Sequence, residues 1–188
     1  MSKLLYIIPG ISESTKNSGY KKIISSAKKH GYIVIPINIL WDKTTMTNWI
    51  QQFESIVKKH RNKNAVALGF SFGAYIVAVS AQQFNFKKII LCSLSPYFKR
   101  DLKYLPLSIY KAFGKRRMED FENYSFPKNM KVPIVFMIGT NDFPLAIKRI
   151  KEYYKKYNGE KSLHLLKKVE HNISDSRYIK EIENELKK

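Results

Sequence analysis

The sequence has a single cysteine, Cys92, and no long apolar run. One cysteine cannot form a disulfide within the chain, so nothing points to an oxidising compartment. The apolar run at the N-terminus is interrupted by Pro9 and Gly10 and is too short for a secretory signal. No stretch approaches the ~20 apolar residues that a membrane-spanning helix needs. We therefore expect a cytoplasmic protein without a membrane span.

Acidic residues are also scarce. The chain has 15 aspartates and glutamates against 34 lysines and arginines, and its formal net charge is +19 at pH 7. Such an excess is typical of proteins that bind nucleic acid or anionic membranes, but lysines spread over nearly every predicted helix and loop also suit a plain solvated surface. The densest basic group faces one acidic neighbour, Asp101. It comprises Lys99, Arg100, Lys103, Lys111, Lys115, Arg116 and Arg117.

Short apolar runs alternate with segments of helical periodicity along the 188 residues. This alternation predicts right-handed crossovers and a mostly parallel sheet with helices on both faces, in one α/β domain spanning residues 1–188. The last run alternates apolar and polar residues, so we expect it nearer the sheet edge. The six predicted strands are 4–8, 32–35, 65–69, 89–94, 134–138 and 162–169.

One segment, at about 95–131, fits neither pattern. It contains Pro96, Pro106 and Pro127 together with the densest basic group, and it is too long for a bare connection. We expect it to form a small, basic, cap-like excursion over the site, and we call it the cap segment.

A candidate nucleophile lies where a strand passes into a helix. Gly69, Ser71 and Gly73 follow an apolar run of strand length and precede an apolar run of helix length. In this context the G-x-S-x-G pattern is typical of a nucleophile elbow, in which the glycines allow a sharp turn because they carry no Cβ. Ser71 would then lie at a helix start, where free N–H groups favour developing negative charge. An ordinary buried strand–turn–helix is the alternative.

A serine hydroxyl needs a base, and one of the four histidines lies where a base is required. His171 follows the sixth predicted strand, at the end of a parallel sheet where ligands bind. His30 and His60 each end a predicted helix among lysines, which indicates exposed helix-terminal residues. His164 lies inside the sixth strand, and we interpret it as structural.

Asp142 is the predicted third member of the set. It follows the fifth strand directly, and a carboxylate there can fix the tautomer of a neighbouring imidazole. In isolation, Asp142 would be interpreted as a cap of the next helix. Asp175 has the pattern of a cap for the last helix, and Asp101 lies in the basic group, where we expect it to pair with its neighbours. We therefore predict Ser71, Asp142 and His171 as catalytic residues.

An acyl-transfer site also needs donors for the oxyanion. The backbone N–H of Phe72, directly after the nucleophile, is one predicted donor. The second is the N–H of Ile11 in the loop after the first strand, where Gly10 permits a tight turn. A plain Pro-Gly turn is the alternative interpretation of that loop.

With these groups in the order Ser, Asp, His, the sequence resembles the α/β-hydrolase family, as a small esterase-like member. The resemblance rests on the motif at 69–73, on Asp142 and His171, and on the loop at 9–11, and it spans almost the whole chain. It implies the strand order 2-1-3-4-5-6, without the antiparallel N-terminal hairpin of larger members. Two features depart from the family pattern: Pro9 replaces a histidine common in esterases, and the two phenylalanines of the motif are bulky.

We therefore predict a serine hydrolase that cleaves carboxylic esters or thioesters of a small-molecule acyl substrate through an acyl-enzyme. We predict no cofactor and no metal, because the histidines lack ligand spacing and no phosphate-binding glycine loop is present. The acyl group, the leaving group and the oligomeric state are not specified by the sequence.

A function of another class is kept beside this one. The chain could be a non-catalytic basic adaptor on a hydrolase fold that binds nucleic acid or anionic lipid through the cap segment. Nucleic acid is the less favoured partner, because no motif that reads DNA or RNA is present. The same cations could instead steer an anionic substrate towards a working site.

Overall fold

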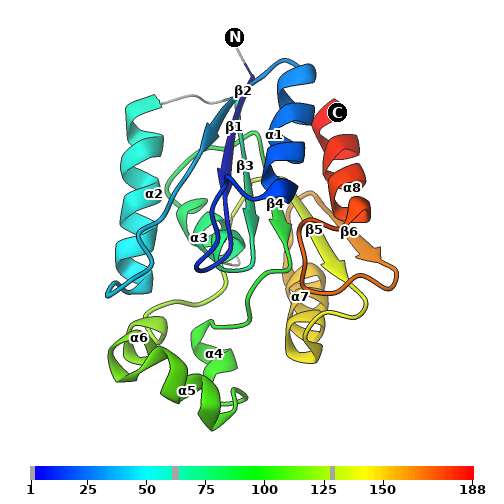
Figure 1. Ribbon diagram of the computed structural model, residues 1–188. Helices are drawn as coiled ribbons and strands as arrows, with labels where there is room; N and C mark the ends of the chain where they lie inside the picture. The colour runs from blue at the N-terminus through cyan, green and yellow to red at the C-terminus, as the bar shows by residue number, and fades with distance from the viewer. Residues whose placement is uncertain (1–2, 61–63, 128–129) are drawn as a thin grey trace.

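The structure is a computed structural model that describes residues 3–60, 64–127 and 130–188. Its centre is a parallel sheet with the strand order β2-β1-β3-β4-β5-β6 (Figure 1). Both the parallel pairing and the order confirm the sequence-based prediction. The strands are β1 Lys3–Ile8, β2 Tyr32–Pro36, β3 Ala65–Phe70, β4 Lys88–Cys92, β5 Ile134–Gly139 and β6 Lys161–Leu166.

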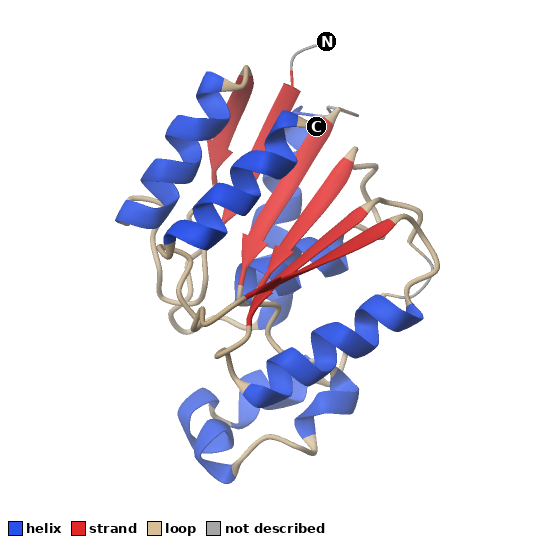
Figure 2. Ribbon diagram, turned by 90° about the vertical axis from the view of Figure 1, so that its right-hand side faces the viewer, coloured by secondary structure: helices blue, strands red, loops and turns tan. Residues whose placement is uncertain are grey.

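Helices cover both faces of the sheet (Figure 2). The helices α1 and α8 pack against each other on one face, and α2, α3 and α7 lie on the other. No helix in the described part of the chain is long and apolar enough to cross a membrane. The helices are α1 Ser18–Lys29, α2 Met46–His60, α3 Phe72–Ser80, α4 Lys99–Leu102, α5 Leu107–Phe113, α6 Lys115–Phe121, α7 Pro144–Lys156 and α8 Ser176–Lys187.

Alternate residues of the central strands enter two separate cores. In β1, Leu5 and Ile7 pack beneath α1 and α8, whereas Leu4, Tyr6 and Ile8 join the core under α2, α3 and α7. This division follows from the two-residue period of a strand. The strands β3 and β5 are buried throughout, while β6 is mostly half-buried at the sheet edge, as its alternating sequence predicted.

Two strands end earlier than the sequence predicted. The fourth stops at Cys92 instead of residue 94, and the sixth stops at Leu166 instead of residue 169. Ser93 and Lys168 follow with φ angles of 47° and 57°, which no strand residue adopts. The chain therefore leaves the sheet at these points. Both lie at the carboxyl ends of the strands, next to the candidate site.

The described residues of the cap segment form the three short helices α4, α5 and α6 beyond the carboxyl ends of the strands (Figure 1). Helix α4 is attached to the body of the protein through Asp101, whose side chain is fully buried. Its Oδ1 lies 2.5 Å from Arg149 Nε of α7, and its Oδ2 accepts a hydrogen bond of 2.5 Å from Tyr153. Asp101 also lies 3.7 Å from Arg100, one of the basic neighbours with which the sequence predicted it to pair. Helix α5, in contrast, has no buried residue.

Candidate active site

Ser71 occupies the sharp turn between β3 and α3. Its φ and ψ are 55° and −117°, a conformation that L-residues rarely adopt, and its N–H donates to Cys92 O at 2.9 Å. The flanking glycines are sterically required. A Cβ on Gly69 would lie 2.3 Å from the carbonyl carbon of Gly73, and a Cβ on Gly73 would lie 2.2 Å from Ile8 O. The local geometry is that of a nucleophile elbow.

The three residues of the predicted set meet at the carboxyl ends of three strands. His171 Nε2 lies 3.0 Å from Ser71 Oγ, and His171 Nδ1 lies 2.9 Å from Asp142 Oδ1. The imidazole packs between Phe70 and Phe143, with ring centroids 4.8 and 5.0 Å away. These contacts fix the ring so that one nitrogen faces the hydroxyl and the other faces the carboxylate, which is the arrangement of a serine–base–acid relay.

The Asp142 side chain is fully buried and has three donors. Besides His171, Ser93 Oγ donates to its Oδ2 at 2.5 Å, and Phe143 N donates to its Oδ1 at 2.7 Å. Burial by itself would raise the pKa of Asp142, but the hydrogen bonds from His171 and Ser93, the His171 charge and the Phe143 N–H together hold this pKa below its usual value. The group is therefore an anion at neutral pH and can stabilise an imidazolium.

Behind Asp142 lies a pair of hydroxyls that the sequence did not reveal. Tyr178 OH lies 2.6 Å from Ser93 Oγ and accepts a hydrogen bond of 3.1 Å from Gly139 N. Burial raises the pKa of Tyr178, which keeps its hydroxyl protonated. The chain Tyr178–Ser93–Asp142 thus ties the carboxylate to α8 and to the end of β5.

A second hydroxyl touches the candidate nucleophile. Ser95 Oγ lies 3.0 Å from Ser71 Oγ, and Ser95 is buried where the chain leaves β4. If His171 Nε2 accepts the Ser71 proton, the Ser95 hydroxyl must donate to Ser71 Oγ, because that oxygen has one proton to give. The only sequence signal for Ser95 is its position directly after a predicted strand.

The two predicted oxyanion donors have suitable surroundings. Phe72 is the first residue of α3, where backbone N–H groups lack helical partners, and Ile11 follows β1 in a turn. Within the described residues neither backbone N–H donates to a protein acceptor. Both residues line the cavity that contains Ser71. Their role as oxyanion donors remains a prediction.

The cavity in front of Ser71 has a volume of about 560 Å³ and mostly apolar walls. The sheet side contributes Ile11 and His171, and the cap segment contributes Tyr97, Leu105 and Phe113. An apolar cavity of this size with a few convergent polar groups is typical of a site for a small organic ligand.

The other candidates from the sequence lie elsewhere in the fold. Asp175 caps α8 by accepting a 2.9 Å hydrogen bond from Arg177 N, as its pattern predicted. His60 is exposed at the last position of α2. His30 departs from the prediction of a simply exposed residue. It is half-buried after α1, and its Nε2 lies 3.2 Å from Glu183 Oε1 of α8.

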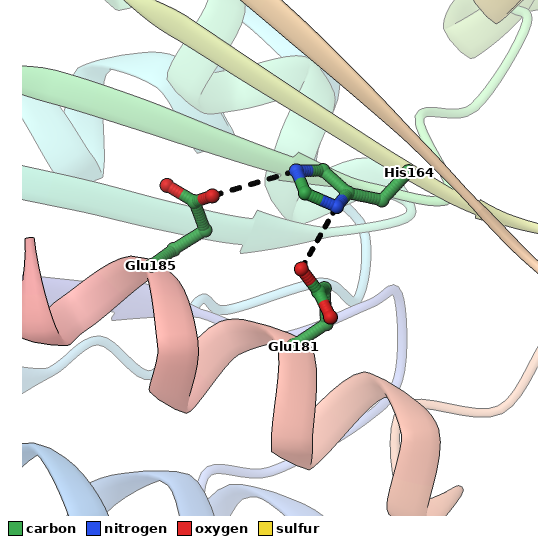
Figure 3. Close-up of side chains that lie close together, drawn as sticks. All are labelled: His164, Glu181 and Glu185. Atoms are coloured by element: carbon green, nitrogen blue, oxygen red, sulfur yellow. Dashed lines mark ion pairs between the residues drawn. The ribbon is translucent and has the colours of Figure 1, made fainter.

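His164 forms the only group of potential metal ligands found within the described residues (Figure 3). Its Nδ1 lies 2.8 Å from Glu181 Oε1, and its Nε2 lies 3.4 Å from Glu185 Oε1. The two carboxylates thus approach opposite ring nitrogens, whereas one metal ion binds one nitrogen of an imidazole. Glu185 also pairs with Lys88 and Lys188. The cluster is therefore better explained as ion pairs that hold α8 to β6, in line with the structural role predicted for His164.

Comparison with solved structures shows which class of fold this is. The α/β hydrolase domain-containing protein 10 from mouse has a TM-score of 0.84 at 12% identity, over 99% of this chain and 89% of that chain. Est1E from Butyrivibrio proteoclasticus has a TM-score of 0.83 at 14% identity, over 99% and 86%. A monoacylglycerol lipase from Paleococcus ferrophilus has a TM-score of 0.77 at 14% identity, over 97% and 93%. The chain has the α/β-hydrolase fold.

Within that class, residues 3–180 match the model of the family described as uncharacterised protein family UPF0227. The chain belongs to this family. Comparison with the curated proteins gives no match.

Proposed function

We propose that the protein is a serine hydrolase that cleaves carboxylic esters or thioesters. The observation that carries the proposal is the continuous chain of contacts from Ser71 Oγ through the His171 ring to Asp142, at 3.0 and 2.9 Å. Three residues from distant parts of the sequence meet in the order that acyl transfer requires, and the hydroxyl opens into an apolar cavity. The fold is also that of a protein named as a monoacylglycerol lipase.

In the proposed reaction, His171 takes the proton of Ser71 while Ser71 Oγ forms a bond to the acyl carbon. Collapse of the tetrahedral intermediate breaks the bond to the leaving oxygen or sulfur, which receives that proton from His171. Water then attacks the acyl-enzyme with His171 again as base, and this step releases the acid and restores Ser71. Asp142 holds the ring and stabilises the imidazolium, and the N–H groups of Phe72 and Ile11 bind the oxyanion.

The cavity favours an apolar acyl group. Its walls include Tyr97, Leu105 and Phe113 of the cap segment together with Leu145 in the first turn of α7. Burying an apolar chain among them is favourable by about 25 cal/mol per Å² removed from water. We therefore expect turnover to rise with acyl length until the cavity is full.

A panel of p-nitrophenyl esters of increasing acyl length tests this function. Wild-type protein should hydrolyse the esters with one preferred length, and Ser71→Ala should lose this activity while it keeps its melting temperature. Ser95→Ala, which removes the neighbouring hydroxyl and leaves the candidate nucleophile, should retain measurable turnover. Hydrolysis that is equal in wild type and Ser71→Ala would overturn the proposal.

A second candidate function is supported by the outer surface of the cap segment. Leu107 and Tyr110 are exposed on α5, beside the exposed cations Lys103, Lys111 and Lys115. Apolar side chains among cations suit the surface of an anionic bilayer, with insertion and charge attraction acting together. In this interpretation, which keeps the adaptor hypothesis, the cap segment binds an anionic lipid surface whether or not Ser71 is active.

Cosedimentation with phosphatidylcholine vesicles, with and without phosphatidylglycerol, tests this second candidate. Binding should require phosphatidylglycerol, weaken with salt and fall in a Leu107→Ser/Lys111→Ser variant. The matched control is Lys58→Ser/Lys59→Ser, at the end of α2 away from the cap segment (Figure 1). Equal vesicle binding by the cap variant and wild type would exclude the lipid surface as the partner. Binding to duplex DNA without binding to vesicles would exclude it as well.

A further inference from the structure

The loop that supplies the Ile11 N–H is a tight turn closed by Glu13. Glu13 N donates to Gly10 O at 3.1 Å, and Ser12, between them, has a φ of 60°. The Gly10 carbonyl and the Ile11 N–H belong to one planar trans peptide and so point in opposite directions. Once Gly10 O is held by Glu13 N, the direction of the Ile11 N–H is fixed as well.

The side chain of Glu13 holds the same turn from a second point. Its Oε2 accepts a hydrogen bond of 3.0 Å from Gly10 N and another from the hydroxyl of Tyr20. Tyr20 OH also accepts a hydrogen bond of 3.1 Å from Gly10 N. The backbone N–H and C=O of Gly10 are therefore both bound, and both by Glu13.

Tyr20 connects this turn to the core of the protein. It is fully buried in α1, within the apolar cluster beneath α1 and α8. Burial, and then the neighbouring Glu13 carboxylate, raises the pKa of Tyr20, so the hydroxyl remains a donor at all working pH values. A rigid helix therefore positions the carboxylate, and the carboxylate positions the turn.

We propose that Glu13, held by Tyr20, is a positioning residue of the oxyanion hole, which keeps the Ile11 N–H directed at the cavity. The inference rests on the proposed function and adds to it residues that the sequence did not mark. Although Glu13 borders the cavity, its Oε2 is occupied by Gly10 and Tyr20, so it acts through the turn and not on the substrate. A carboxylate suits this position because one of its oxygens can accept both hydrogen bonds.

The test compares Glu13→Ala, Glu13→Gln and Tyr20→Phe with p-nitrophenyl butyrate as substrate. Loss of an oxyanion donor costs roughly 10²- to 10³-fold in kcat, so a misdirected donor in Glu13→Ala should cost about 10- to 100-fold, with KM nearly unchanged. Glu13→Gln keeps an oxygen acceptor and should recover most of the loss. Tyr20→Phe removes the hydrogen bond from the tyrosine hydroxyl to the carboxylate but leaves Glu13 in place. Its kcat should therefore lie between those of Glu13→Ala and Glu13→Gln.

A tetrahedral inhibitor separates positioning from a general structural effect. Butylboronic acid forms a tetrahedral adduct with a serine, and its binding should weaken by the same factor as kcat in each variant, because both report oxyanion binding. Tyr6→Phe and Glu119→Ala are the controls. Tyr6 is a buried tyrosine whose hydroxyl has no partner among the described residues, and Glu119 is exposed on α6. Both controls should match wild type in kcat and in boronate binding.

The possible failures can be told apart. Wild-type protein without ester turnover would overturn the proposed function and this inference with it. Wild-type turnover together with unchanged kcat and boronate binding in Glu13→Ala would overturn this inference alone. If Glu13→Ala does not fold, as judged by its melting curve, Tyr20→Phe decides: wild-type kcat and boronate binding in that variant would refute the positioning role.

Discussion

The predicted catalytic set and helix α5 lie on opposite sides of one cavity, and they are held by different means. Asp142 is fully buried among three donors, and the His171 ring packs between two phenylalanines. Helix α5 has no buried residue, and Leu107 at its start is 69% exposed. The side chains of the predicted set are thus held by buried contacts, whereas α5 is held by partly buried contacts such as those of Phe113 with Phe72 and Phe121.

The base on the sheet rim should give the largest effect. In the proposed mechanism His171 moves the proton in both half-reactions, so His171→Ala should lower kcat by about 10⁵- to 10⁶-fold. The measurement is p-nitrophenyl butyrate hydrolysis by wild type and variant. His164→Ala, which removes the histidine of the ion-pair cluster between β6 and α8, is the control and should leave kcat near wild type. A His171→Ala variant with more than a tenth of wild-type activity would remove His171 from the mechanism.

Asp142 should give the next largest effect. Asp142→Asn keeps the shape of the side chain but cannot stabilise the imidazolium, so kcat should fall by about 10³- to 10⁴-fold while KM changes little. Asp175→Asn is the matched control, since that carboxylate caps α8 and pairs with Arg177. Equal loss of activity in Asp142→Asn and Asp175→Asn would contradict the proposed role of Asp142.

The attachment of the cap segment should appear in stability. Arg149→Met leaves the buried Asp101 carboxylate without its closest cation, and we expect a loss of about 3 kcal/mol in the free energy of unfolding. Urea denaturation measures it. The exposed pair of Lys115 and Glu119, 3.7 Å apart, is the control, and Lys115→Met should match wild type within error. Equal stability of all three proteins would show that α4 is not held through Asp101.

The smallest change in stability is expected on α5. Leu107→Ser alters an exposed side chain and should leave the urea midpoint unchanged, because little buried area is lost. The contrasting variant is Phe136→Ala in β5, whose fully buried ring should cost about 3–5 kcal/mol on removal. A marked loss of stability in Leu107→Ser would mean that α5 is packed against something in solution.

The sequence predicted the fold and the three-residue set because both have local signals. Ser71, Asp142 and His171 each follow an apolar run of strand length, and parallel strands bring their carboxyl ends to one edge. The resemblance to α/β-hydrolases supplied the strand order, which the structure confirms. The structure brings the three side chains into contact, and their catalytic roles remain predictions.

The supporting residues could not be predicted in the same way. Ser93 contacts Asp142 from 49 positions away, and Tyr178 contacts Ser93 from 85 positions away. Neither serine nor tyrosine has a pattern that indicates such a contact. Glu13 and Tyr20 look like a loop acid and a helix core residue until the turn around Gly10 is seen. The partners of His164 on α8 depend on how a terminal helix packs against an edge strand, which periodicity does not specify.

The ends of β4 and β6 could not be predicted from the apolar pattern of the sequence either. Residues 93–94 and 167–169 are apolar or alternating enough to extend their strands, but the chain turns there to bring Ser93 and His171 to the site. Propensity is a weak guide at such positions, because tertiary contacts decide where a strand stops.

The central claim is that Ser71 is a nucleophile activated by His171. A fluorophosphonate probe tests it directly, with intact-mass measurement of wild type, Ser71→Ala and Ser95→Ala after equal exposure. The account predicts one adduct on wild type, the same adduct on Ser95→Ala and none on Ser71→Ala. Labelling of Ser71→Ala to the same extent as wild type would contradict it.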